Sequence, residues 1–132
     1  MNTIFENADI YIERELSEIP WVKIFTRYPY KELTDCPKRL RKELYECCEI
    51  IEKMMREYYR PEKINIASFG NYMPHLHIHV MARFKEDSYF PEPMWGKKRR
   101  EGKLMLPPFE PFAQKAAKEM ANFFEKSGES RS

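Results

Sequence analysis

The sequence lacks the features that mark membrane, secreted and disulfide-rich proteins. No apolar run approaches the roughly 20 residues that span a membrane as a helix. The N-terminal segment has no basic stretch followed by an apolar one, so we expect no signal peptide. The three cysteines, Cys36, Cys47 and Cys48, are odd in number and two are adjacent, which disfavours a disulfide framework. A reducing compartment fits better, and the cytoplasm is the simplest location.

The sequence also lacks an excess of charge of one sign. Its 23 basic and 21 acidic residues leave a formal net charge of +2, which gives no electrostatic case for nucleic acid as a partner. Hydrophobic residues make up 42% and aromatic residues 14% of 132, enough for one domain with one core. We expect a single domain over residues 1–126 and a polar C-terminal tail over residues 127–132.

Five segments have the alternation or the β-branched and aromatic content of strands. They are residues 3–5, 10–13, 21–26, 63–69 and 75–84. The last two are separated only by the short turn 70–74, so we expect them to be antiparallel neighbours.

Two helices are expected beside these strands. Apolar residues recur at helical spacing between Pro37 and Pro61, with Thr34 or Asp35 as the cap and Pro37 in the first turn. A second helix is expected over 109–125, after a proline-rich loop at 85–108. Its apolar stripe consists of Phe112, Ala116, Met120 and Phe123. The pattern predicts an α+β domain in which the long helix covers the apolar side of a sheet.

All three histidines of the chain fall within five residues. His75, His77 and His79 alternate with apolar residues at 76, 78 and 80. Because a strand points successive side chains to opposite faces, the imidazoles would share one face and the apolar residues the other. Histidine is the side chain that titrates nearest neutral pH, so this pattern indicates a site for chemistry.

The residues leave three interpretations of the histidines open. They are ordinary surface residues, a metal site, or a nucleophile with helpers. Ligands at 75 and 79 would lie roughly 13 Å apart along a strand, whereas zinc needs each nitrogen at about 2.1 Å, so we expect no metal site. For a nucleophile that attacks phosphorus, His77 is the best candidate because it has an imidazole on each side. His79 or His75 would be the helper, and the turn Gly70–Tyr72 would supply donors to phosphate.

The histidine segment and the residues around it resemble the histidine triad (HIT) family. Residues 75–81 match its signature of alternating histidines followed by apolar positions, and Gly70 stands seven residues before the central histidine. Arg83 stands where many members carry an arginine. Residues 87–96 resemble the tail of a bacterial branch often described as diadenosine tetraphosphate hydrolase-like, and Pro20-Trp21 before a strand also fits that branch.

The resemblance implies a five-stranded antiparallel sheet with a long helix and a C-terminal helix, and homodimers that join two sheets into ten strands. It implies nucleotidyl hydrolases or transferases that act at the α-phosphate. Carried over by position, His77 would form a nucleotidyl-histidine intermediate. His79 would contact the bridging oxygen of the leaving group, and His75 would orient the site.

The resemblance also suggests substrate contacts. Asn71 occupies the position of a phosphate-contacting glutamine, and Asn65 lies near another polar binding position. Tyr72 replaces a frequent serine or threonine donor, beside Gly70. Trp95 would stack on a base or close the pocket. The chain departs from many members in having no fourth histidine.

The expected activity is therefore hydrolysis of a nucleoside phosphoanhydride such as diadenosine tetraphosphate. No cofactor is required, and Mg²⁺ is expected only with the substrate's polyphosphate. The alternatives are hydrolysis of an AMP–amine phosphoramidate, or a nucleotide-binding sensor with little turnover.

Overall fold

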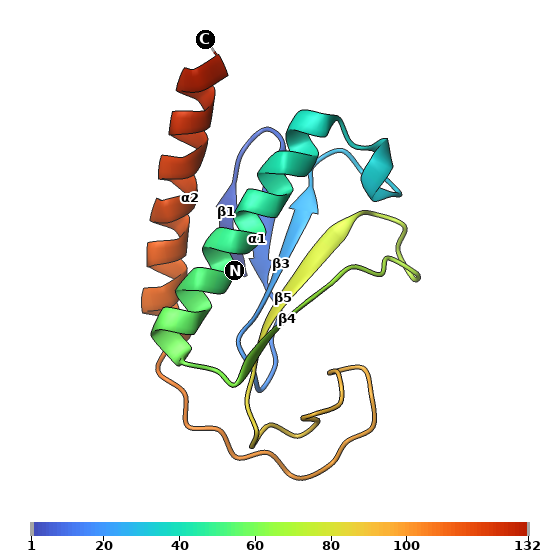
Figure 1. Ribbon diagram of the computed structural model, residues 1–132, viewed down its shortest axis with the longest axis vertical. Coiled ribbons are helices and arrows are strands. Elements are labelled where there is room, and N and C mark those ends of the chain that lie inside the picture. Colours follow the sequence, from blue (N-terminus) through green and yellow to red (C-terminus); the bar gives the residue numbers. More distant parts are fainter. Residues whose placement is uncertain (1, 132) are drawn as a thin grey trace.

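Five strands form one antiparallel sheet with the order β1-β2-β3-β5-β4 in the computed structural model, which describes residues 2–131 and side chains through residue 126 (Figure 1). The strands are β1 (Thr3–Glu6), β2 (Ile10–Arg14), β3 (Trp21–Thr26), β4 (Lys63–Ala67) and β5 (His77–Arg83). Each neighbouring pair is antiparallel, which confirms the expected sheet and the predicted pairing of β4 with β5.

The histidine strand β5 lies inside the sheet rather than at its edge. It inserts between β3 and β4, so that His77 pairs with Phe25 and His79 pairs with both Lys23 and Ala67. The preceding strands β1, β2 and β3 form a simple meander. A position between two strands satisfies the backbone of β5 on both sides and gives the histidines a rigid support.

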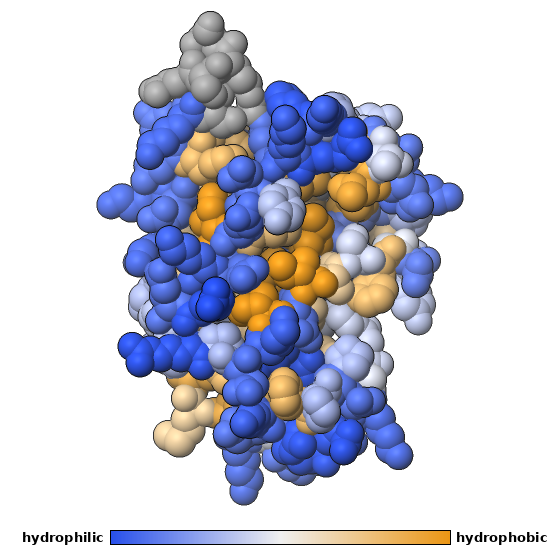
Figure 2. Space-filling view, viewed as in Figure 1, coloured by the Kyte–Doolittle hydropathy of each residue, from blue (hydrophilic) through white to orange (hydrophobic). Residues whose placement is uncertain are grey.

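Both long helices lie on one face of the sheet (Figure 1). Helix α1 (Lys38–Tyr59) packs on β3, β4 and β5, and α2 (Phe109–Arg131) packs beside α1 and on β1. Figure 2 shows a strip of hydrophobic side chains between hydrophilic ones on this side of the molecule. No described helix is long and apolar enough to cross a membrane.

The core lies between the sheet and the helices. Its fully buried members come from both layers and are nearly all aliphatic or sulfur-containing: Ile10, Ile12, Val22, Ile24, Leu44, Cys47, Ile51, Met55, Val80, Ala82, Phe112, Ala116 and Met120. The apolar stripes predicted for the two helices therefore face the sheet, as amphipathic helices do.

The start of α1 differs from the prediction. Thr34 and Asp35 lie in a separate short 3₁₀ helix (η1, Leu33–Asp35), and Pro37 itself is the N-cap, without a side-chain hydrogen bond. A proline disfavours the α-helical conformation of the residue before it. Cys36 is accordingly extended, with φ −72° and ψ 142°. The helix therefore cannot begin before Pro37.

Three other boundaries shift by two residues or more. Strand β4 ends at Ala67, and β5 begins at His77 instead of His75. Helix α2 continues to Arg131, through the segment expected to be a tail. His75 lies outside β5 because its N–H donates to the Met73 carbonyl in the preceding turn, at 2.7 Å.

Candidate functional site

The face of the sheet opposite the helices carries the histidines. Paired residues of antiparallel strands share a face, so the register assigns one set of side chains to it: Trp21, Lys23 and Phe25 of β3, Asn65 and Ala67 of β4, and His77, His79, Met81 and Arg83 of β5. The intervening residues of β3 and β5 belong to the core. Strand periodicity thus separates the two functions of β5, as the sequence predicted.

His77 is held with one nitrogen available. Its Nδ1 lies 2.7 Å from the backbone carbonyl oxygen of His75. A carbonyl can only accept, so Nδ1 donates its hydrogen and the lone pair of the neutral ring resides on Nε2. The ring of Phe25 stacks on His77 at 4.8 Å with an interplanar angle of 19°. The imidazole is therefore fixed in both orientation and tautomer.

His75 contributes to the site mainly through its backbone. Its carbonyl orients His77, while its own Nε2 donates to the carbonyl of Thr26 at 2.6 Å. The ring lies edge-on to Phe25 at 5.4 Å, so it remains on the histidine face although it precedes β5. The prediction that all three histidines lie on one strand is wrong, because β5 begins at His77, two residues after His75. The prediction that the three rings share one face still holds.

His79 is buried and has a different partner. It is 7% exposed, and its Nδ1 accepts a hydrogen bond from the indole Nε1 of Trp21 at 3.0 Å. Burial first, and then the neighbouring charges of His77 and Lys23, lower the pKa of His79 to about 4 against a small opposing effect of Glu15. His79 is therefore neutral near neutral pH.

Trp95 covers His79 from the long loop. The two rings are 5.0 Å apart, and Trp95 also contacts the rings of Trp21 and Phe69 at 5.2 and 4.7 Å. About half of Trp95 remains exposed. A pocket of about 350 Å³ lies beside it, lined by Asn65, Phe69, Trp95 and their neighbours on β4. Trp95 thus packs the loop onto the site and leaves one side of its ring available.

A buried ion pair anchors the loop that carries Trp95. Arg83 donates from Nε to Asp87 at 2.9 Å, from Nη1 to Asn65 Oδ1 at 2.9 Å and from Nη2 to the Glu92 carbonyl at 2.6 Å. Burial would raise the pKa of Asp87, but hydrogen bonds from Arg83 and from three backbone N–H groups hold it below its usual value. Asn65, expected to bind substrate, therefore has its oxygen engaged in this network.

The turn between β4 and β5 lies next to His77. Gly70 has φ +69°, a left-handed conformation that glycine adopts without strain. The hydroxyl of Ser68 donates to the carbonyl of His77 at 2.7 Å and ties the turn to β5. The side chains of Asn71 and Tyr72 are exposed. Their expected contacts with phosphate remain predictions.

The basic run in the long loop has mainly local partners. Arg100 donates to the carbonyls of Asp87 and Phe90, each at 2.7 Å, and Lys98 pairs with Glu101 at 2.7 Å. These contacts favour a structural role for this stretch of the loop over contact with a substrate.

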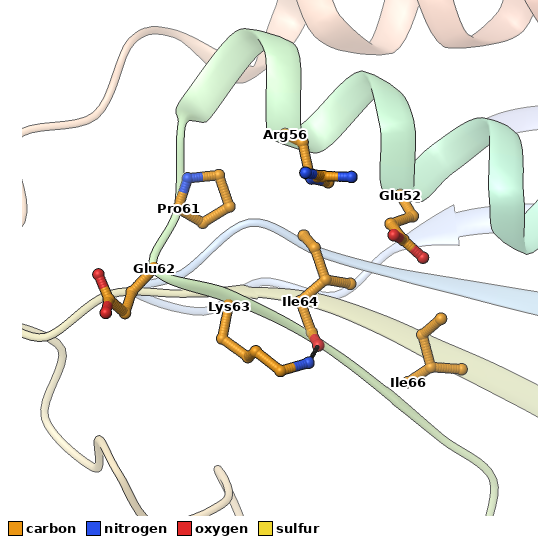
Figure 3. Close-up of a pocket in the computed structure, with 7 residues that line it drawn as sticks. All are labelled: Glu52, Arg56, Pro61, Glu62, Lys63, Ile64 and Ile66. Carbon is orange, nitrogen blue, oxygen red and sulfur yellow. Dashed lines mark hydrogen bonds between the residues drawn. The ribbon is translucent and has the colours of Figure 1, made fainter.

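A second pocket, of about 490 Å³, lies between the end of α1 and β4 (Figure 3). Its lining includes the charged side chains of Glu52 and Arg56 from α1, above Ile64 and Ile66 of β4. The register places those two isoleucines on the helix side of β4, but both also line the pocket beside Trp95, so the two pockets meet at this edge strand. Among the described residues, no group of three or more His, Cys, Asp or Glu side chains is arranged to hold a metal ion.

Three residues of β3 belong to the site, although the sequence analysis did not assign them to it. Trp21 binds His79, Phe25 stacks on His77, and Lys23 lies opposite His79 in the register, paired with Glu15 at 3.1 Å. Their alternation showed that they share a face. Nothing in the sequence shows that β3 neighbours β5, because more than 50 residues separate Trp21 from His79.

Comparison with known proteins identifies the family and supports the fold. The HIT domain family model matches residues 12–86. A histidine triad protein from Sinorhizobium meliloti 1021 is 27% identical, with 91% of this chain and 87% of that chain covered and a TM-score of 0.69. Histidine triad proteins from Marinobacter aquaeolei VT8 and Bradyrhizobium japonicum are each 22% identical and share the fold. Their TM-scores are 0.74 and 0.72, over 90% of this chain and 91% and 90% of theirs. No curated protein gave a match.

Proposed function

Because this chain belongs to the HIT domain family, we propose that it hydrolyses a nucleoside phosphoanhydride at the α-phosphate, as in diadenosine tetraphosphate. The family includes nucleotide hydrolases and transferases as well as non-catalytic members. The proposal places this chain in the hydrolase branch that its sequence resembles. The observation that carries it is the fixed tautomer of His77: Nδ1–H donates to the His75 carbonyl, so the neutral ring has its lone pair on Nε2.

In the first step, Nε2 of His77 attacks the α-phosphorus. A P–N bond forms as the P–O bond to the remaining phosphates breaks, and the leaving polyphosphate takes the bonding electrons. The modified imidazole gains positive charge, which the hydrogen bond from Nδ1 to the His75 carbonyl stabilises. In the second step, water attacks the same phosphorus and loses a proton to the solvent. A P–O bond forms as the P–N bond breaks, AMP is released, and the bonding electrons return to Nε2 of His77.

Other groups around His77 would stabilise the phosphates. Lys23 lies on the same face and can offset negative charge, and His79 can donate from Nε2 to the bridging oxygen. Backbone N–H groups of the Gly70 turn are candidates for the non-bridging oxygens. No cofactor takes part in this scheme, and Mg²⁺ would arrive with the polyphosphate.

We also propose a homodimer in which two sheets join into one of ten strands. Strand β4 is an edge of the sheet and leaves about half of Ile66 exposed, which fits pairing with a second copy. The cysteines at 36, 47 and 48 are free and buried, which suits a reducing compartment, and we propose the cytoplasm. Analytical ultracentrifugation would test the dimer.

Product analysis tests the proposed reaction. Diadenosine tetraphosphate would be incubated with the protein, with Mg²⁺ and with a chelator, beside the His77→Ala variant. Attack at the α-phosphorus yields AMP plus ATP, and the variant yields neither. Two molecules of ADP would show a central cut and would overturn the mechanism. Tight nucleotide binding without products would favour the sensor.

A further inference from the structure

We infer that Trp21 holds His79 as a neutral hydrogen-bond donor that keeps its proton, so that the site selects leaving groups that depart as anions over leaving groups that depart as amines. The positioning role of Trp21 is drawn from its contact with His79. The selectivity rests in addition on the proposed function, because it concerns the bond that His77 breaks.

The Trp21–His79 hydrogen bond determines the tautomer. An indole N–H can only donate, so Nδ1 of His79, at 3.0 Å, must be the acceptor and carries no hydrogen. A neutral imidazole has one hydrogen on its two nitrogens, and here it must be on Nε2. Protonation of Nδ1 would bring two N–H groups face to face and break the bond. Trp21 therefore opposes the charged form of His79.

The surroundings of His79 act in the same direction. Lys23 of β3 stands opposite it in the register, and the ring of His77 on β5 is 4.8 Å away. Glu15 favours a proton on His79, but it pairs with Lys23 at 3.1 Å. Trp95 and Phe69 cover the ring with apolar surface, at 5.0 and 6.3 Å. Burial first, and then the charges of His77 and Lys23, lower the pKa of His79 to about 4, although Glu15 acts in the opposite direction.

A neutral Nε2–H imidazole can donate a hydrogen bond, but it is a poor source of protons. Loss of the Nε2 proton would leave an imidazolate, because Nδ1 has no hydrogen to retain. A phosphate or polyphosphate departs as a stable anion and needs only the hydrogen bond from His79. An amine must gain a proton as the P–N bond breaks, since the nitrogen anion is far too basic to depart. The geometry therefore favours a phosphoanhydride over a phosphoramidate.

Imidazole NMR tests the role of Trp21 without any substrate. Long-range ¹H–¹⁵N spectra report which nitrogen of each ring is protonated, and the chain has only three histidines. We expect the wild-type His79 to be protonated on Nε2 alone at neutral pH. Trp21→Phe keeps an aromatic ring but removes the N–H. This change should mix the tautomers and move the pKa of His79 from about 4 towards the ordinary 6.5.

Trp95→Phe is the matched control, because Trp95 contacts the same ring at 5.0 Å without a hydrogen bond to it. We expect this variant to keep the Nε2–H tautomer. A wild-type His79 protonated on Nδ1, or a tautomer unchanged by Trp21→Phe, would overturn the assigned role of Trp21.

A comparison of substrates tests the selectivity. Diadenosine tetraphosphate and an AMP–alkylamine phosphoramidate would be compared by kcat/KM at neutral pH. A positioned general acid contributes at least about 100-fold, so we expect the phosphoramidate to be slower by at least about that factor. In the Trp21→Phe variant, the ratio of kcat/KM for diadenosine tetraphosphate to kcat/KM for the phosphoramidate should be smaller, because His79 can then be protonated and donate a proton to the amine. Equal or faster cleavage of the phosphoramidate would overturn the selectivity while leaving attack by His77 intact. If neither is cleaved, the proposed function fails together with the selectivity, and the NMR result decides on Trp21 independently.

Discussion

The two faces of the sheet are stabilised in different ways. On the helix side, Val22 and Ile24 of β3 and Val80 of β5 are fully buried among other apolar side chains. On the opposite side, each histidine ring has one hydrogen bond to a defined partner in the protein. Apolar contacts are non-directional and tolerate adjustment, whereas a hydrogen bond sets the orientation of a ring and the position of its proton. One face supplies stability, and the other supplies a fixed arrangement of nitrogen atoms.

His77→Ala should give the largest loss of activity. It should also show most clearly that the histidine face supplies activity and the helix-side face supplies stability. Loss of a nucleophile that forms a covalent intermediate typically costs at least about 10⁴-fold in kcat. The melting temperature should change little, because His77 is only half-buried. Single-turnover assays and thermal denaturation would measure both quantities. Near-normal turnover would show that another group attacks the phosphorus.

Asp87→Asn should destabilise the loop side of the histidine face. Removal of one partner of a buried ion pair costs about 3–5 kcal/mol, because the other charge is left unpaired, and Arg83 and Asp87 are both almost fully buried. Urea unfolding at neutral pH would measure this loss. Lys98 pairs with Glu101 at the surface, so Glu101→Gln is the control and should change stability by less than about 1 kcal/mol.

The same carboxylate should make the effect depend on pH. The pKa of Asp87 is lowered in the folded state from its ordinary 3.8, so its stabilising contribution is present above 3.8 and is lost as pH falls through the lower folded value. The difference in unfolding free energy between wild type and Asp87→Asn should therefore shrink below pH 3.8. A difference that stays constant to lower pH would show that the negative charge is not its source.

Ile24→Ala tests the opposite face of the same sheet. Ile24 is fully buried and is flanked in sequence by Lys23 and Phe25, which face the site. Truncation of a buried isoleucine costs about 2–5 kcal/mol. Turnover per folded molecule should stay close to wild type, as measured by kcat below the melting transition. A large loss of kcat would show that the two faces are more strongly coupled than the hydrogen bonds indicate.

His75→Gln should give the smallest effect. The backbone carbonyl that orients His77 is retained, and the amide Nε2 of glutamine can still donate towards the Thr26 carbonyl. We expect a loss of about five-fold in kcat/KM, the equivalent of roughly 1 kcal/mol for one weakened hydrogen bond. A loss as large as that of His77→Ala would assign a direct chemical role to the His75 ring.

Much of the fold could be predicted from local patterns. Residues 21–26 alternate and carry β-branched and aromatic side chains, and β3 has those bounds. The stripe that includes Phe112, Ala116 and Met120 predicted the buried side of α2 correctly. The start of α1 could not be predicted as well, because two good capping residues precede it. The decision between them and Pro37 depended on the extended backbone at Cys36.

The sequence by itself determined that the histidines share one face and that His77 lies between the other two, because strand periodicity is a local property. Only the tertiary structure decided that β3 lies beside β5. That pairing brings Trp21 to His79 and Phe25 to His77, and it gives the three rings different roles. Strand pairing depends on contacts between residues far apart in the chain. The hydrogen bond that determines which nitrogen of His79 carries the proton therefore cannot be predicted from the local sequence pattern.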